Sequence, residues 1–325
     1  MNDGTGSMRS KADAALELVF PATSANLGPA FDAAALAFRL YLHVRAQAAP
    51  AFSIKAEGRD AEICGQLENH LILTTYREVL EERGKRVIPL ALQIKNEMPI
   101  GKGCGSSAAA RLAGIALAVQ FGKLGWNDSQ IIGEASRREH HPDNAAACWM
   151  GGLCVARMCN ECEAQAVKIA PKGKWSLLFA VPDTALPTEE ARRVLPDQYS
   201  RADAVSNVQN SMLLLAAFVQ GRHDLLASAL QDRIHQPHRA HLCPLLPAIQ
   251  QMQGREGVLG VALSGAGPSV LVFLDPARPA NKTKAAIAQH LAKHGLSAEL
   301  FLTSIAEKGA SEQKAWKNSQ ARSRR

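Results

Sequence analysis

The chain has 325 residues, a formal net charge of +7 and seven cysteines. This length can hold two domains with cores of their own, and no run of eighteen apolar residues is available to cross a membrane. Six basic residues and one acidic residue lie in 308–325, so the charge is concentrated there and the sequence does not favour nucleic-acid binding. The first residues lack the apolar core of a secretion signal, so we expect a cytoplasmic protein with reduced thiols.

The hydrophobic pattern predicts a mixed order of strands and helices along the chain. In chain order these are strands at 15–20, 40–46 and 52–56, a helix at 71–83, a strand at 90–98, helices at 108–121 and 128–138, strands at 153–158, 166–169 and 177–181, helices at 204–220, 224–231 and 246–252, strands at 258–263 and 270–274, a helix at 281–294 and a strand at 298–302. Because strands and helices do not alternate strictly, the pattern favours an α+β fold over a doubly wound sheet.

A glycine-rich segment joins the strand at 90–98 to the helix at 108–121. It reads Pro99, Ile100, Gly101, Lys102, Gly103, Cys104, Gly105, Ser106, Ser107 and Ala108. Its glycines permit positive φ angles, and its serines fall where the free N–H groups of a helix N-terminus favour anions. The segment predicts a phosphate-binding loop. It lacks the Walker spacing, and it matches the dinucleotide pattern without the second parallel strand that this pattern needs. A serine-capped turn is the remaining alternative.

Two clusters contain residue types that bind metals: Cys154, Cys159 and Cys162, and then His235, His238, His241 and Cys243. The first cluster flanks a predicted hairpin and has no evident fourth ligand, which favours structural thiols. Prolines interrupt the second cluster, and its three-residue spacing drifts around a helix, so we do not expect a zinc site there.

Two further segments are rich in glycine and small polar residues: Pro21-Ala-Thr-Ser-Ala-Asn-Leu-Gly-Pro-Ala-Phe-Asp32 and Gly260-Val-Ala-Leu-Ser-Gly-Ala-Gly-Pro-Ser269. With the loop at 99–108 they resemble the three signature motifs of the galactokinase, homoserine kinase, mevalonate kinase and phosphomevalonate kinase (GHMP) superfamily. The first motif, together with His141-Pro-Asp-Asn144, residues 188–196 and Pro237-His-Arg239, is similar to the homoserine kinase branch. The resemblance spans about residues 15 to 305.

This resemblance implies ATP-dependent phosphorylation of the L-homoserine hydroxyl to O-phospho-L-homoserine, in threonine biosynthesis. It also implies a homodimer and a two-domain fold. We expect an N-terminal extension at 1–12, an ATP-binding domain like ribosomal protein S5 domain 2 at 13–171, a ferredoxin-like domain at 172–307, and a disordered basic tail at 308–325. Another GHMP small-molecule kinase and a catalytically silent regulatory relative are the alternatives.

The resemblance further implies roles for individual residues. ATP would contact residues 99–108 together with Ser264, Gly265 and Gly267. Ser106 would bind Mg²⁺ with one carboxylate, for which Glu139 matches the family position better than Glu134.

The substrate is a zwitterion, so its site needs both cations and acceptors. Arg192 and Arg239 match the positions that bind the substrate carboxylate, a task that suits the forked guanidinium. The positions around its amino group and hydroxyl correspond to Asn26, Asp32, His141 and Asp143. The predicted catalytic residues are Asn26, Asp32 and Arg192. The resemblance implies that no side chain is well placed as a base, so we assign none and expect direct proton transfer to the γ-phosphate. The structural alternatives are an exposed helix arginine at 192 and a helix cap at Asp143.

Three residues depart from the family pattern. Ala30 replaces a glycine, which matters only if that position has a positive φ. Cys104 replaces a leucine, and His140 replaces a glycine next to the substrate position. None of the three removes a charged group that the reaction requires.

Overall fold

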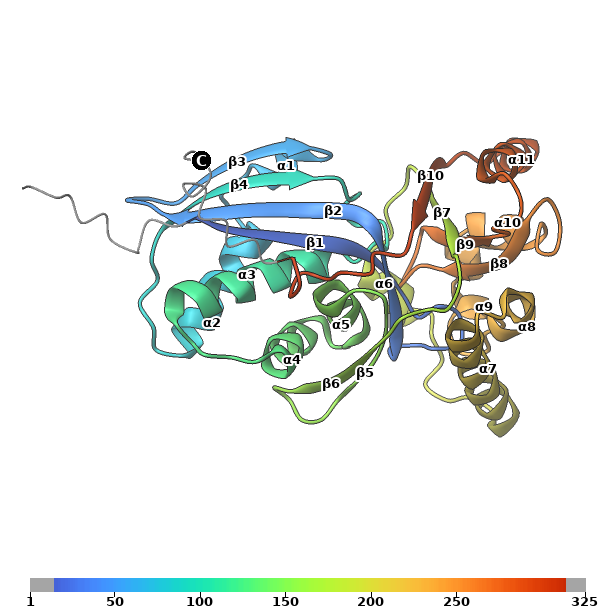
Figure 1. Ribbon diagram of the computed structural model, residues 1–325, viewed down its shortest axis with the longest axis horizontal. Helices are drawn as coiled ribbons and strands as arrows, with labels where there is room; N and C mark the ends of the chain where they lie inside the picture. The colour runs from blue at the N-terminus through green and yellow to red at the C-terminus, as the bar shows by residue number, and fades with distance from the viewer. Residues whose placement is uncertain (1–14, 314–325) are drawn as a thin grey trace, which may run out of the picture.

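The computed structural model describes residues 15–313 and contains two sheets, each covered by helices (Figure 1). The first sheet has the strands β1 (Leu16–Ala25), β2 (Ala34–Ala48), β3 (Ser53–Gly58), β4 (Leu90–Asn96), β5 (Leu153–Met158) and β6 (Ala164–Ile169). Its order is β3-β4-β2-β5-β6, with β1 paired to β2. Only the β3–β4 pair is parallel.

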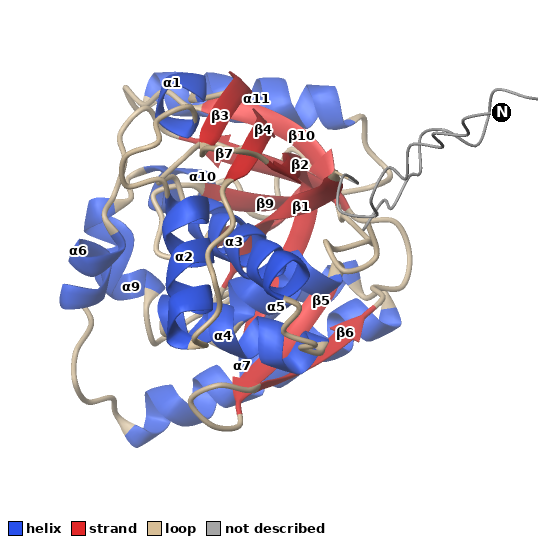
Figure 2. Ribbon diagram, turned by 90° about the vertical axis from the view of Figure 1, so that its left-hand side faces the viewer, coloured by secondary structure: helices blue, strands red, loops and turns tan. Residues whose placement is uncertain are grey.

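The helices of this half are α1 (Ala61–Cys64), α2 (Leu71–Glu82), α3 (Ser106–Gly122), α4 (Asp128–Glu139) and α5 (Asp143–Met150). Figures 1 and 2 show α3 to α5 between the strands β1 to β4 and the β5–β6 hairpin. The alanine-rich helix α3 is buried along most of its length, and Gly114 lets it approach α2 closely. A Cβ at Gly114 would lie 2.5 Å from the Ile72 carbonyl oxygen.

The second sheet has the strands β7 (Ser176–Val181), β8 (Val258–Leu263), β9 (Val270–Leu274) and β10 (Glu299–Ser304) in the antiparallel order β10-β7-β9-β8. Its helices are α6 (Thr188–Arg193), α7 (Arg201–Gln220), α8 (Leu226–Ala229), α9 (Gln236–Arg239), α10 (Leu245–Gln250) and α11 (Ala280–Lys293), with short 3₁₀ turns at His223–Leu225 and Ala240–Leu242. The succession of strand, helices, two strands, helix and strand is ferredoxin-like. The predicted two-domain α+β fold is confirmed.

The two halves share one apolar core. The rings of Phe38 on β2 and Phe179 on β7 lie 4.8 Å apart, and both side chains are fully buried. The chain then returns to the first half after β10, where Ile305 pairs with Phe38. The second sheet is therefore held against the first by packing as well as by the chain connections.

The sequence predicts a disordered basic tail from residue 308 onward. In the structure, residues 308–313 are instead ordered and pack on α5. The N–H groups of Ala310 and Ser311 donate to the carbonyls of Cys148 and Trp149. Gly309 permits this approach, because a Cβ there would lie 2.3 Å from the Trp149 oxygen. The predicted extension at 1–12 and the rest of the predicted tail lie outside the described residues.

Most predicted elements correspond to observed ones, with β5, β8 and β9 at the predicted bounds. The first strand continues through Pro21 to Ala25, and β2 begins at Ala34, because these two segments pair with each other. The short helices α1, α5, α6 and α9 were not among the predicted elements. Within residues 15–313, none of the helices combines the length and apolar composition that crossing a bilayer requires.

Candidate active site

A cavity of about 820 Å³ lies between the two halves, and the segments singled out in the sequence meet around it. Two loops line it with Asn26 and Asp32 after β1 and Gly265 to Gly267 after β8. The segment at the start of α3 contributes Gly101, Gly103, Gly105, Ser106 and Ser107, and the segment from the end of α4 to the start of α5 contributes Glu139, His140, His141, Asp143 and Asn144. Arg192 on α6 and Arg239 on α9 complete this part of the lining. Loops from both sheets therefore form one site.

Two glycines of the loop before α3, Gly103 and Gly105, lie where neighbouring atoms leave no room for a Cβ. Gly105 has a φ of 70°, and a Cβ there would lie 1.9 Å from the Thr23 hydroxyl. Gly103 has a φ of 78°, and its Cβ would lie 2.5 Å from the Ser264 carbonyl oxygen. The Ser264 hydroxyl also donates to the Gly103 carbonyl at 2.6 Å. The first, second and third motifs are thus packed against one another through this loop.

Helix α3 begins at the cavity without a side-chain cap. Its first N–H groups therefore carry the partial positive charge that attracts anions. Of the predicted ATP-binding residues, those that line the cavity are Ile100, Gly101, Gly103, Gly105, Ser106, Ser107, Gly265 and Gly267. Pro99, Lys102, Cys104, Ala108 and Ser264 are not among the lining residues.

Lys102 and Cys104 hold the loop from outside the cavity. The Lys102 ammonium donates to the carbonyls of Pro182, at 3.0 Å, and Asp183, which ties the loop to the second half of the molecule. The Cys104 thiol is buried in the core and donates to the Pro99 carbonyl at 3.0 Å. Burial raises the pKa of the Cys104 thiol to about 12, so the replacement of leucine leaves an unreactive side chain.

Glu139 faces the loop, whereas Glu134 does not line the cavity. The Glu139 carboxylate accepts from the Ser107 hydroxyl at 2.8 Å and from Arg111 at 2.6 Å. Glu134 is buried and accepts from Arg137 at 2.8 Å and from Arg138 at 2.7 Å. The geometry therefore favours Glu139 over Glu134 as the candidate metal ligand.

Asn26 links the first motif to the third. Its φ is 71°, and its side-chain oxygen accepts from the Asp32 N–H while its amide donates to the Gly265 carbonyl, both at 2.9 Å. The carboxylate of Asp32 is paired with Arg192, whose nearest nitrogen lies 3.0 Å away. Asn26 thereby fixes the position of the loop that carries Asp32.

Asp32, His141 and Asp143 place one ligand atom each within 4.8 Å of one another, which no other group of metal-binding residue types does in residues 15–313. His141 Nδ1 lies 2.7 Å from Asp143 Oδ1. Burial lowers the His141 pKa, but the hydrogen bond and charge of Asp143 outweigh it and leave the pKa raised. The other oxygen, Asp143 Oδ2, is buried without a hydrogen-bond partner.

Two arginines lie over the Phe31 ring, with Arg192 at 5.7 Å and Arg239 at 5.4 Å from the ring centre. Arg239 is buried, donates to the Ala191 carbonyl at 2.8 Å, and forms no ion pair with a carboxylate in the part of the chain that the structure describes. Burial and the neighbouring Arg192 charge lower the pKa of Arg239 to about 10. An anionic ligand would relieve this unbalanced buried charge.

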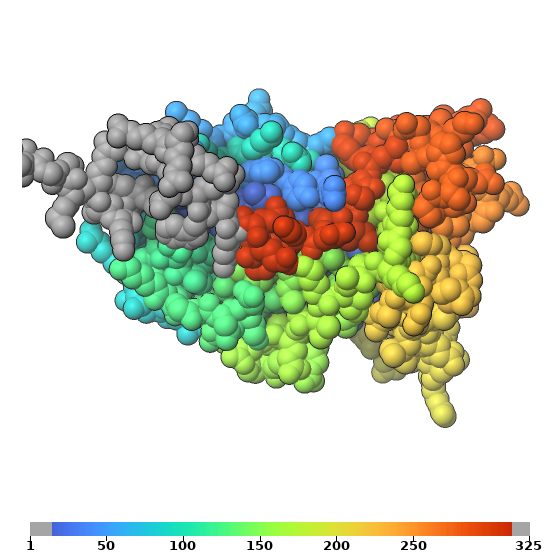
Figure 3. Space-filling view, viewed as in Figure 1, coloured from blue at the N-terminus to red at the C-terminus, as the bar shows by residue number. Residues whose placement is uncertain are grey.

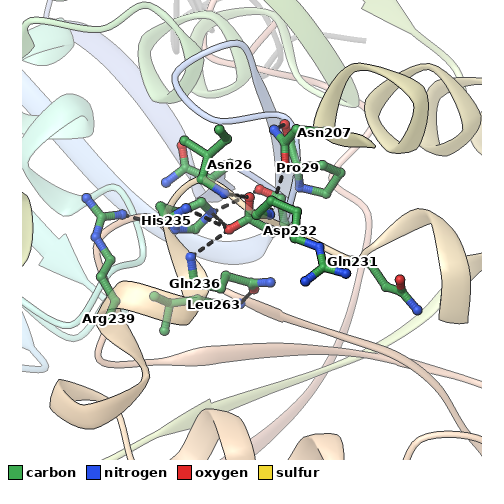
Figure 4. A network of polar contacts seen from close by, with 12 residues as sticks. Asn26, Pro29, Asn207, Gln231, Asp232, His235, Gln236, Arg239 and Leu263 are labelled. Atoms are coloured by element: carbon green, nitrogen blue, oxygen red, sulfur yellow. Dashed lines mark hydrogen bonds and ion pairs between the residues drawn. The ribbon is translucent and has the colours of Figure 1, made fainter. Parts of the chain in front are cut away.

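A network behind Arg239 was not predicted from the sequence (Figure 4). His235 is fully buried, its Nδ1 lies 3.2 Å from Arg239, and its Nε2 lies 2.9 Å from the Gly28 carbonyl. Asp232 accepts from the N–H groups of His235 and Gln236, at 2.9 and 2.6 Å. The four-residue spacing of His235 and Arg239 on one helical turn is the signal that could have revealed this pair.

Neither of the two metal-type clusters from the sequence is assembled as a ligand set in the described residues. Cys154 is buried, whereas Cys159 and Cys162 are exposed. His235 is buried and His241 is exposed. Of the departures from the family pattern, Ala30 has no positive φ, so its Cβ is tolerated, whereas His140 lines the cavity with a φ of 68°.

Comparisons with known proteins agree with this geometry. Residues 70–152 match the GHMP kinases N terminal domain, and residues 214–293 match the GHMP kinases C terminal model. The fold and its loops are those of this class of kinases.

Similarity to individual relatives shows which family of GHMP kinases the chain belongs to. The chain is 42% identical to homoserine kinase from Solibacter usitatus, over 90% of this chain and 95% of that protein. It is 38% identical to homoserine kinase from Desulfitobacterium hafniense, over 89% of this chain and 97% of that protein. The crystal structure of homoserine kinase from Cytophaga hutchinsonii shares the fold, with a TM-score of 0.76 and 23% sequence identity. The match covers 93% of this chain and 98% of that chain. The chain therefore belongs to the homoserine kinase family of the GHMP kinases.

Proposed function

We propose that this chain transfers the γ-phosphoryl group of ATP to the hydroxyl of L-homoserine, giving O-phospho-L-homoserine and ADP for threonine biosynthesis. One observation supports the substrate: among the described residues, a carboxylate oxygen without a hydrogen-bond partner and a buried guanidinium without a carboxylate partner line the same cavity. Asp143 Oδ2 has no hydrogen-bond partner, and Arg239 has no carboxylate partner within residues 15–313. An amino acid supplies both an ammonium and a carboxylate, whereas mevalonate, shikimate and galactose lack the ammonium.

The nucleotide side of the cavity is suited to a triphosphate. GHMP kinases use ATP as phosphoryl donor, and here the uncapped start of α3 at Ser106 faces the cavity beside Gly265 and Gly267. Backbone N–H groups at such a helix end bind phosphate oxygens without a charged side chain. Phosphoryl transfer depends mainly on this kind of positioning and charge neutralisation.

The residues next to the loop also fit Mg²⁺. The Ser106 hydroxyl and the Glu139 carboxylate are hard oxygen donors, the type that Mg²⁺ prefers, and both line the cavity. Ser107 and Arg111 hold the Glu139 carboxylate toward the loop. When bound, Mg²⁺ would neutralise charge on the β- and γ-phosphates. We therefore propose that the reaction requires Mg²⁺. We also propose that the active protein is a homodimer.

On the substrate side, Arg192 and Arg239 would bind the carboxylate of homoserine, while Asp143 Oδ2 would accept from its ammonium group. His141 keeps Asp143 in place through the 2.7 Å contact to its other oxygen. Asn26 and Asp32, next to Arg192, would orient the reacting hydroxyl.

In the reaction the hydroxyl oxygen forms a bond to the γ-phosphorus as the bond to ADP breaks. The hydroxyl proton passes to a γ-phosphoryl oxygen, so no side chain is assigned as the base.

A coupled assay of ADP release tests this proposal with homoserine, mevalonate, shikimate and galactose as acceptors. We expect turnover with homoserine alone, dependent on Mg²⁺, and O-phosphohomoserine as the product by mass spectrometry. Turnover with another acceptor but not homoserine would contradict the substrate assignment. The absence of turnover with all four would indicate a silent relative.

A further inference from the structure

The Phe31 ring contacts both arginines that are proposed to bind the substrate carboxylate. The guanidinium carbons of Arg192 and Arg239 lie over this ring, at 5.7 and 5.4 Å from its centre. The imidazole of His235, which also contacts Arg239, stacks on the ring, with the ring centres 5.2 Å apart and 28° between the planes. Phe31 is half-buried and lines the cavity. Two cations therefore meet at an uncharged aromatic side chain.

The two arginines carry more positive charge than the neighbouring carboxylate balances. Asp32 pairs with Arg192, at 3.0 Å, whereas Arg239 is buried and has no carboxylate partner within residues 15–313. In the absence of a bound anion, repulsion between the two guanidinium groups favours their separation. The Arg192 side chain is 36% exposed, so it has room to move toward the solvent. A region of negative potential next to both arginines would oppose this separation.

The face of the Phe31 ring supplies such a region, because the π electrons of an aromatic ring make its face negative. A guanidinium within about 6 Å of the ring centre is attracted to this face, and the attraction is stronger where water is excluded. Both guanidinium groups lie within this distance. The ring also differs from a carboxylate, because it forms no ion pair that the substrate carboxylate would have to replace. It therefore attracts both arginines and leaves them available to the ligand.

The loop that carries Phe31 is fixed by contacts to its backbone. Asn207 of α7, the helix that Figure 3 shows in yellow at the lower right, donates to the Pro29 carbonyl at 2.6 Å. His235 contacts the Gly28 carbonyl at 2.9 Å, and Figure 4 shows Pro29, Asn207 and His235 close together. Because the backbone just before Phe31 is held from two elements, the ring is a fixed surface against which the longer arginine side chains can rest.

We propose that Phe31 is a positioning residue for the substrate carboxylate, because its ring holds Arg192 and Arg239 near one another before the substrate binds. This inference rests on the proposed function, from which it takes the role of the two arginines. It predicts that the electron density of the ring, and not only its volume, contributes to homoserine binding. The ATP KM should be much less affected, because the proposed phosphate contacts come from the start of α3.

Fluorinated phenylalanines at position 31 of the full chain test this role. Fluorine withdraws electrons from the ring face and changes the size of the ring little, so a series with one, two and three fluorine atoms weakens the attraction for cations stepwise. Nonsense suppression introduces these residues, and Phe31→Leu removes the ring. We expect the homoserine KM to rise along the series, to about 10-fold for the trifluorinated ring and at least as much for Phe31→Leu. The ATP KM should stay within about two-fold of the wild type.

Phe52 provides a matched control, because Arg77 lies over its ring, at 4.3 Å from the ring centre, and Phe52 does not line the cavity. The same series at position 52 should leave the homoserine KM unchanged. Urea unfolding of the ligand-free chain adds a measurement that needs no assumption about the reaction. The unfolding midpoint should fall along the series at position 31, and it should fall less in an Arg192→Met background, where one of the two cations is absent.

Two outcomes would overturn the proposal. The first is a homoserine KM that is the same for every fluorinated ring at position 31 while Phe31→Leu raises it, since the ring would then act by packing alone. The second is an unfolding midpoint that does not fall along the series, or that falls equally with and without Arg192. A wild-type chain without homoserine turnover would instead contradict the proposed function, and the unfolding series would still decide whether the ring attracts the arginines.

Discussion

His235 Nδ1 accepts a hydrogen bond from the Arg239 guanidinium at 3.2 Å, while Nε2 donates to the Gly28 carbonyl at 2.9 Å. The two contacts require a neutral imidazole with its proton on Nε2. Burial lowers the His235 pKa, an effect that outweighs the opposing charge of Asp232. The neutral ring therefore joins the first motif loop to the arginine that we propose binds the substrate carboxylate.

Replacing Arg239 should affect homoserine and ATP differently. We expect Arg239→Ala to raise the homoserine KM about 100-fold, because the buried positive charge that would pair with the carboxylate is lost. The ATP KM should change much less, because the proposed phosphate contacts come from the N–H groups at the start of α3, although Arg239 also donates to the Gly265 carbonyl at 3.3 Å. Arg239→Lys keeps the charge without the fork and should give an intermediate KM. Steady-state assays with each substrate varied in turn measure both constants, and an equal loss for the two substrates would contradict this role.

The buried neutral imidazole predicts a pH dependence of stability. The folded-state pKa of His235 is lowered, so the unfolded chain binds a proton below pH 6.5 that the folded chain does not. Stability from this group is therefore complete above pH 6.5 and is lost as the pH falls. Between pH 7.5 and pH 5 the loss should be about 2 kcal/mol.

The variant His235→Gln isolates this contribution, because glutamine does not titrate. Urea unfolding of both proteins at pH 7.5 and pH 5 gives the change in the free energy of unfolding for each. The wild type should lose more of this free energy than the variant on acidification. Equal losses would show that His235 does not titrate differently in the folded and unfolded chains.

Glu139 and Glu134 lie on the same helix but should have different roles. We expect Glu139→Gln to lower kcat about 100-fold and to raise the Mg²⁺ concentration needed for half-maximal rate. The reason is that the variant lacks the negative carboxylate that we propose binds Mg²⁺ beside the phosphates. Glu134→Gln should leave the Mg²⁺ dependence unchanged. It should lower the free energy of unfolding by about 3 kcal/mol, because Arg137 and Arg138 lose a buried partner. Mg²⁺ titrations and urea unfolding separate the two effects, and a reversed pattern would reassign the metal ligand to Glu134.

Two glycines of the phosphate loop form a matched pair for stability. Both have φ near 70°, but a Cβ at Gly105 would collide with Thr23, whereas one at Gly101 would meet nothing within 4 Å. Gly101→Ala should lower the free energy of unfolding by about 1 kcal/mol from backbone strain alone. Gly105→Ala should cost about 3 kcal/mol or more, because the loop or Thr23 must also move. Chemical denaturation compares the two, and equal costs would show that the Thr23 contact is not tight in solution.

The sequence alone was sufficient to predict the loop from Pro99 to Ala108, because its signals are local. A strand pattern precedes it, an alanine-rich helix follows it, and glycine is the residue that most readily adopts the positive φ angles found there. The same holds for strands such as β8 and β9, whose apolar runs end at clear turns. Helix α5 was not predicted, because it is short and buried on nearly all sides, and therefore lacks an apolar–polar periodicity.

Only the tertiary structure decided between groups that are equivalent in the sequence. Glu134 and Glu139 are both helical carboxylates beside arginines, and they differ only in which neighbours the packing of α2 and α3 brings to them. In the sequence, His235 is part of a cluster of metal-binding residue types. In the structure, one of its ring nitrogens contacts the Gly28 carbonyl and the other contacts Arg239. Local signals in the sequence thus indicated which segments form the candidate site, whereas long-range packing determined which side chains in these segments line the cavity and which partners they contact.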